Sequence, residues 1–254
     1  MTLLHAVILF LAAVLAGALN SVAGGGSFIS FPTLIFTGVP AITANATSTV
    51  ALWPGSVASV GAYRREFRPW PGLFLLGLSS LAGGLLGAEL LLHTPPATFV
   101  RLIPFLLLVA TLLFTFGGSL TAGLRRRVEK MEMAPWVITG ALAFIQLIIA
   151  TYGGYFGGGI GILMLAALAL AGMENIHEMN ALKTLLATCI NGVAVVTFIA
   201  AGAVAWPQAL VMLVGAITGG YGGAHIARQL NPLLVRRFVS VVGVVLTVYF
   251  FIRG

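Results

Sequence analysis

Long apolar runs, separated by short polar or charged stretches, fill almost the whole chain. Eight runs of about 20 residues are long enough to cross the ~30 Å hydrocarbon core of a bilayer as helices. They lie at 3–22, 42–62, 71–92, 99–118, 134–152, 180–202, 207–226 and 233–252. Two shorter runs, 27–38 and 160–172, predict helices of only ~18–20 Å, which would be short or partly re-entrant. The pattern predicts an all-α polytopic membrane protein.

Each short run follows a glycine cluster that interrupts the apolar pattern. The clusters are Gly24-Gly25-Gly26, within 20–29, and Gly157-Gly158-Gly159, within 152–161. Each glycine destabilises a helix by about 1 kcal/mol relative to alanine, and unpaired backbone groups in hydrocarbon cost several kcal/mol more. Such breaks are tolerated where they are buried or line a cavity, and a matched pair in two halves indicates a transporter binding site.

The two halves of the chain also match one another in order, at an offset of 133 to 136 residues. The matched pairs are 24–26 with 157–159, 45–49 with 180–184, 81–89 with 217–225, and 100–101 with 235–236. They predict an internal duplication with a first repeat at 1–123, a basic loop at 124–133 and a second repeat at 134–254. Each repeat would hold four long transmembrane helices and one short, glycine-broken helix.

The arginines suggest how the repeats are oriented. Basic residues gather in the loops at 63–70, 119–133 and 227–237, whereas the loops at 93–98 and 203–206 carry none. The positive-inside rule places the basic loops in the cytoplasm and the other two outside. The equivalent loops 63–70 and 203–206 then lie on opposite sides, so we expect inverted repeats. The alternative is a parallel arrangement of four plus four helices, in which the short segments do not cross.

Composition and charge exclude several classes of protein. The chain is 59% hydrophobic and only 7% charged, against about 25% charge in a soluble domain, and it has no aspartate. One cysteine, Cys189, allows neither an intramolecular disulfide nor a zinc site built on cysteine pairs. The net charge of +7 comes from arginines in short loops, so we expect no nucleic-acid partner. We expect 6–19 to be retained as a helix, because no lysine or arginine precedes it as in a signal peptide.

At these motifs the chain resembles the sulfite exporter TauE/SafE family of membrane permeases. The resemblance rests on N-x-x-A-G-G-G-S-x-x-x-x-P at 20–32, A-N-A-T-S-T at 44–49, G-x-F-G-G-G-x-G at 154–161 and N-A-x-K at 180–183. Many members carry a proline after the second glycine cluster, where this chain has Leu163-Met164-Leu165, so we expect a less sharply defined second short helix. The resemblance implies a bacterial inner-membrane transporter, by family tendency an exporter, of small sulfur-containing anions or organic acids such as sulfite, sulfonates or sulfoacetate.

An anion site agrees with the chemistry of the same residues. Helix N-termini present unpaired N–H groups and partial positive charge, and glycine lets a ligand approach them closely. Amides, hydroxyls and the Lys183 ammonium, which is costly in an apolar helix, add further donors. The expected substrate-binding residues are Asn20, Gly24, Gly25, Gly26, Ser27, Asn45, Ser48, Thr49, Gly157, Gly158, Gly159, Asn180, Lys183 and Thr184.

Structural roles compete with ligand roles for several of these residues. Asn45 and Asn180 could bond between helices or cap them, and Lys183 could pair with Glu174 or Glu178 or extend to the interface. The glycines of 83–87 and 219–223 fit close helix packing better than ligand binding.

Glu89 and His225 occupy equivalent repeat positions and are candidates for proton coupling. No histidine or cysteine spacing indicates a metal site, and we expect no cofactor. The expected partners are a small anion and the lipid bilayer, with a homodimer left open. A passive anion channel would use the same lining residues. An intramembrane enzyme is the weakest alternative, because no nucleophile-and-base or metal motif is present.

Overall fold

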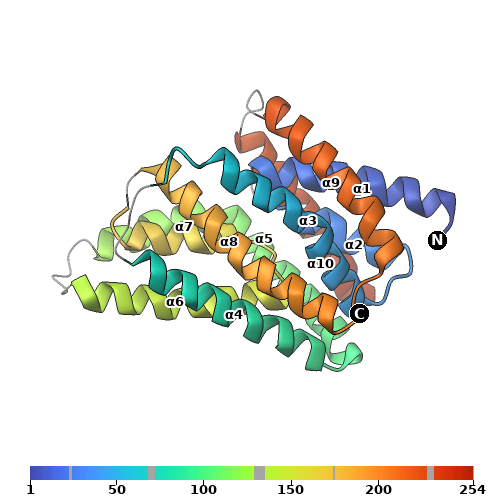
Figure 1. The fold of residues 1–254 in the computed structure, drawn as a ribbon, viewed down its shortest axis with the longest axis horizontal. Helices are drawn as coiled ribbons and strands as arrows, with labels where there is room; N and C mark the ends of the chain where they lie inside the picture. The colour runs from blue at the N-terminus through green and yellow to red at the C-terminus, as the bar shows by residue number, and fades with distance from the viewer. Residues whose placement is uncertain (23–24, 68–71, 129–134, 174, 228–231, 254) are drawn as a thin grey trace.

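The computed structural model describes residues 1–22, 25–67, 72–128, 135–173, 175–227 and 232–253. Inside the helices, the side chains of 21–22, 62, 114, 117–128, 135–136, 138, 221–227 and 232–236 are outside the description. Over these ranges the fold is entirely helical, with ten helices (Figure 1). In chain order they are α1 (Leu3–Val22), α2 (Ser27–Phe36), α3 (Ala41–Ala62), α4 (Leu73–His93), α5 (Pro96–Val128), α6 (Pro135–Tyr155), α7 (Ile160–Leu170), α8 (Ile176–Ala200), α9 (Trp206–Ala227) and α10 (Pro232–Arg253).

Every predicted run corresponds to one helix, and the two short helices begin where the glycine clusters end. α2 starts at Ser27 and α7 at Ile160, as the sequence predicts. α7 is bounded by two glycines with left-handed backbone, Gly159 at φ 78° and Gly172 at φ 81°. It is therefore as well defined as α2, contrary to the expectation drawn from its missing proline. Pro32 lies inside α2 rather than at its end.

Two helix ends differ from the prediction. α5 continues to Val128, so the first residues of the predicted basic loop 124–133 are helical. α6 continues through Gly153 and Gly154 to Tyr155, so the second break shrinks to 156–159. These two glycines stay helical because neighbouring helices pack on them: a Cβ on Gly153 would lie 3.0 Å from Ile190 of α8, and one on Gly154 would meet the Gly84 carbonyl oxygen.

Small residues set the closest helix crossings, as the sequence predicts for the glycine-rich spans. α4 lies on α6 where Gly83 and Gly87 face backbone atoms of Leu147 and Thr151. α1 lies on α9 in the same way, with Gly17 against Ala216 and Gly219 against Val14. In each case a methyl group would overlap the opposite backbone. The glycines therefore allow the helix axes to approach closely.

These crossings join the two halves of the chain. α1 packs mainly on α9, and α6, at the equivalent position in the second half, packs mainly on α4. α3 contacts α8 and α9, and α8 contacts α3 and α4, again in matching positions. This reciprocal pattern is what a two-fold relation between the halves would produce. The inversion itself, and the division at 124–133, remain predictions.

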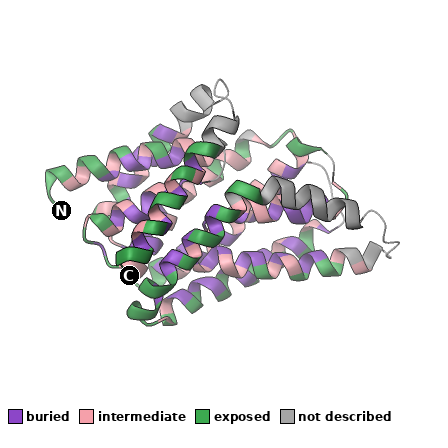
Figure 2. Ribbon diagram, turned by 180° about the vertical axis from the view of Figure 1, so that it is seen from behind, coloured by how far each residue is buried: buried purple, intermediate pink, exposed green. Residues whose placement is uncertain are grey.

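The surface of the helix bundle is apolar. Large side chains such as Phe74, Phe144 and Val196 are exposed on its outer faces, while the buried positions line the helix contacts (Figure 2). Four helices of the described part, α1, α4, α5 and α8, are long and apolar enough to cross a membrane by length and composition. Apolar helices that expose this much hydrophobic surface belong in lipid, so the protein is an integral membrane protein. The count of four spanning helices in each half remains a prediction.

Helix ends that flank two of the three basic loops lie on one side of the molecule. The end of α3, the start of α4, the end of α5 and the start of α6 lie on the left in Figure 1, opposite the α4–α5 and α8–α9 connections. We expect Arg65, which is exposed, to face the cytoplasm and Ala201, also exposed, to face outward. In a Cys189→Ala background, Arg65→Cys should be labelled only from the cytoplasmic side and Ala201→Cys only from outside. Labelling of both from one side would contradict the inverted arrangement.

Candidate functional site

The second glycine cluster separates α6 from α7 in a buried turn. Gly157 and Gly159 adopt left-handed backbone at φ 80° and 78°, which only glycine adopts without strain. Gly158 and Gly159 lie against Ala110 of α5. The N–H groups of Ile160 and Gly161, at the start of α7, have no acceptor within their own helix.

The first glycine cluster is held by a chain of polar contacts. The Gly26 N–H donates to Asn20 Oδ1 at 3.0 Å, and the Ser30 hydroxyl donates to the Gly26 carbonyl at 3.1 Å. Ser30 and Ser48 then share a hydrogen bond of 2.6 Å between their hydroxyls, and both side chains are buried. Asn20 and Ser48, both predicted to bind substrate, thus bond to the protein itself. Gly24 lies outside the described residues.

Asn45 joins the first half of the chain to the second break. It is 3% exposed and lies in the second turn of α3, so it is not a helix cap. Its Nδ2 donates to the carbonyl oxygen of Tyr155, the last residue of α6, at 3.0 Å. The interhelical alternative raised from the sequence is therefore present for Asn45. Thr49 bonds to the Asn45 carbonyl in its own helix.

Asn180 and Lys183 form the corresponding pair on α8. Asn180 is also in the second turn of its helix, whose cap is Asn175. The Lys183 ammonium donates to Asn180 Oδ1 at 3.0 Å. Lys183 Cδ would lie 3.3 Å from a Cβ on Gly161, so the lysine stem runs over the first turn of α7. The structure therefore places the Lys183 side chain over the start of α7, bonded to Asn180, while Thr184 bonds back to the Asn180 carbonyl.

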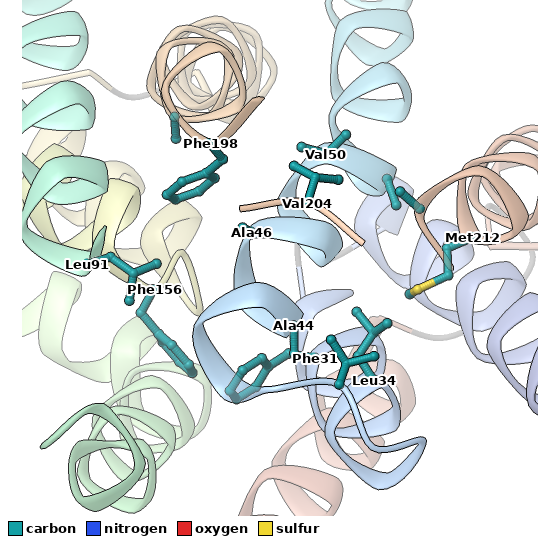
Figure 3. Packing of buried hydrophobic residues seen from close by; sticks show 14 of the residues in the cluster. Phe31, Leu34, Ala44, Ala46, Val50, Leu91, Phe156, Phe198, Val204 and Met212 are labelled. Atoms are coloured by element: carbon teal, nitrogen blue, oxygen red, sulfur yellow. The ribbon is translucent and has the colours of Figure 1, made fainter. Parts of the chain in front are cut away.

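An aromatic cluster connects the second break to α2. The Phe31 and Phe156 rings meet edge to face at 5.6 Å between centroids, in the core shown in Figure 3. Phe99 packs against Phe31 at 6.4 Å and against Tyr155 at 5.8 Å. The Tyr155 hydroxyl also shares a hydrogen bond with Thr94 at 3.2 Å. Through these contacts the start of the second half is packed directly on the short helix of the first.

Several polar residues inside the bundle were missed from the sequence, among them Ser30, Tyr155 and Gln146. Tyr155 contributes its carbonyl, hydroxyl and ring to three different neighbours, but nothing in its local pattern distinguishes it from a packing residue. Gln146 is 2% exposed in α6 and donates to Ser80 of α4 at 2.8 Å. A lone glutamine in an apolar span is costly unless it is paired. Its presence in the sequence could therefore have indicated a buried polar partner.

Of the two candidate proton-coupling residues, only the Glu89 side chain is described. Glu89 lies near the end of α4, half exposed, with its carboxylate 3.6 Å from His93 of the next turn. His225 lies outside the described side chains. Glu89 and His93 line an open surface pocket with Val196 and Thr197 of α8, away from the glycine clusters.

Replacing Asn45 should show how much its hydrogen bond to Tyr155, beside the second break, stabilises the protein. We expect Asn45→Ala to lower the free energy of unfolding by about 1–3 kcal/mol, because the partly buried Tyr155 carbonyl loses its donor. Thermal unfolding in detergent measures the change. Thr33→Val, which removes only a bond to the Ile29 carbonyl in the same helix, serves as the control. An Asn45→Ala protein as stable as the parent would contradict this role.

Comparison with known proteins gives the family of this chain. The sulfite exporter TauE/SafE family matches residues 9–250. The chain belongs to this family. It is similar to a protein named "Probable membrane transporter protein" from Haemophilus influenzae, 27% identical over 94% of this chain and 92% of that one. A Sinorhizobium protein with a similar name is 29% identical over 94% and 90%. "Probable membrane transporter protein YfcA" of Escherichia coli is 28% identical over 94% and 87%.

No solved structure matches the chain. The family and the names of these relatives indicate a membrane transporter rather than an enzyme. Neither the names of these relatives nor that of the family fixes a substrate for this TauE/SafE protein.

Proposed function

We propose that this protein is a secondary transporter that exports small sulfur-containing or organic anions, such as sulfite, sulfonates or sulfoacetate, across the bacterial inner membrane. The anion would bind near the middle of the bilayer, between the two glycine breaks. The observation that carries the proposal is the position of Lys183, whose side chain crosses the first turn of a helix that begins inside the bundle.

The depth of this point supports a site inside the membrane. α7 has 11 residues, and at 1.5 Å per residue it spans ~16 Å, about half of the hydrocarbon core. Lys183 is the eighth residue of α8 and lies ~10 Å from the start of that helix. α7 ends and α8 begins at the same connection, and the Lys183 stem reaches the first turn of α7.

The chemistry of the residues at this depth suits an anion. The N-terminus of α7 carries partial positive charge, roughly half a unit, and Lys183 adds a full one. Gly157, Gly158 and Gly159 leave the backbone open to close approach by ligand oxygens. In the first half, Gly25, Gly26 and Ser27 would frame the other side of the site, with Asn45 holding the second break in place.

Counterflow in proteoliposomes tests the function directly. Purified protein in vesicles loaded with unlabelled sulfite or sulfoacetate should accumulate the labelled anion transiently from outside and show saturable uptake. A linear, non-saturating flux without counterflow would indicate a channel instead. Absence of flux and of binding for sulfite, sulfonates and carboxylates would reject the proposal.

A further inference from the structure

Ser48 and Lys183 occupy the same position in the two halves, but the structure uses them differently. The Ser48 hydroxyl bonds to Ser30, which holds α3 to the short helix α2. Lys183 bonds instead to Asn180 of its own helix and extends over Gly161 of α7. A charged side chain therefore lies beside the second break, whereas the described contacts of the first break join neutral groups.

Several polar groups in the described part of the first break have protein partners. The Gly26 N–H is bonded to Asn20, and the Phe28 N–H in the first turn of α2 is bonded to the Gly25 carbonyl at 3.1 Å. The Asn45 amide donates to Tyr155. An arriving anion would have to break these bonds before it could use the same donors.

At the second break the ammonium of Lys183 has a neutral partner. Among the described residues its polar contact is the Asn180 amide oxygen, which accepts a hydrogen bond but does not neutralise the charge. A Cβ built on Gly26, Gly157, Gly158 or Gly159 would meet only alanine, phenylalanine, asparagine and backbone atoms as its nearest neighbours. A partly buried cation beside neutral neighbours is costly unless a ligand supplies the opposite charge.

We propose that the second half alone binds the charged group of the substrate, and that the site binds anions with one negative charge more tightly than dianions such as sulfoacetate. This inference rests on the proposed function and names the substrate class of that same site. Lys183 neutralises one charge, and the N-terminus of α7 adds only a partial charge. The second charge of a dianion would lose its water without a cation of its own. This second charge would lie further from Lys183 than the first. The attraction between the two does not offset the free energy lost when the second charge leaves water.

Two probes of nearly equal shape test the charge preference. Sulfoacetate carries a sulfonate and a carboxylate, whereas in sulfoacetamide the carboxylate is replaced by a neutral amide. Both groups of sulfoacetate are ionised near neutral pH. Calorimetric titration of the purified parent protein should show at least about tenfold tighter binding of sulfoacetamide. Equal binding, or tighter binding of sulfoacetate, would overturn the single-charge inference.

Lys183→Gln tests which residue sets that preference. The variant should bind sulfoacetamide at least about tenfold more weakly than the parent, with far-ultraviolet circular dichroism unchanged. Thr188→Val, which removes a bond to the Thr184 carbonyl one turn further along α8, should leave both affinities unchanged. If Lys183→Gln binds both probes as the parent does, Lys183 does not hold the anion. If the folded parent binds neither probe nor sulfite, the proposed function fails, whereas binding without charge preference rejects only this inference.

Discussion

Valine at Gly154 is expected to prevent the protein from folding, although the same change at Gly140 in the same helix should be tolerated. A Cβ on Gly154 would overlap the backbone carbonyl of Gly84, which cannot rotate away as a side chain can. Around Gly140 no atom lies within 4 Å of such a Cβ. The yield of monodisperse protein in detergent distinguishes the two variants.

Alanine at the same two positions, Gly154 and Gly140, is a milder test of the same packing. Helix propensity alone favours alanine over glycine by about 1 kcal/mol at both positions. At Gly154 the overlap should outweigh that gain and lower stability by about 1–3 kcal/mol. At Gly140 the propensity gain should remain, so the sign of the change in unfolding free energy differs between the two. Stabilisation by Gly154→Ala would show that α4 and α6 are less closely packed than described.

Valine at Gly158 should abolish transport while leaving the fold intact. The new Cβ would lie 2.9 Å from the edge of the Phe156 ring and 3.3 Å from the Ala110 methyl. Phe156 can shift, so the helices need not separate. The branched side chain would fill the space in front of the α7 N-terminus. Anion counterflow in proteoliposomes, with Gly140→Val as the control for reconstitution, measures the loss.

The outcome separates the two roles that a glycine can have in this chain. Retained flux in well-folded Gly158→Val would place the anion path elsewhere. Loss of folded protein would show that the second break is a packing element like the α4–α6 crossing.

The helices were predictable because hydrophobic period and length determine them in a membrane. Even the short helices could be assigned, because Ser27 and Ile160 directly follow glycine clusters, which destabilise a helix. What could not be predicted is which glycines interrupt the helix. Gly154 and Gly158 are chemically identical, and the difference arises because α4 packs on the first and α5 on the second.

The candidate site was only partly predictable for the same reason. The unusual residue types Asn45, Asn180 and Lys183 could be identified in apolar surroundings from the sequence alone. Their partners could not, because the Tyr155 carbonyl is 110 positions from Asn45 and its acceptor role has no side-chain signature. The asymmetry of the breaks likewise depends on the contact between Ser30 and Ser48.

The packing of α1 on α9 has a consequence for biosynthesis. Between Val22 and Trp206 lies most of the chain, which a ribosome translates at about 5–20 residues per second, so α1 enters the membrane roughly 10–40 s before its partner exists. During that interval its glycine and alanine face has only lipid or the insertion machinery to contact. Neither half can complete its own interior, so separately synthesised halves would be degraded alone and recover function only when made together.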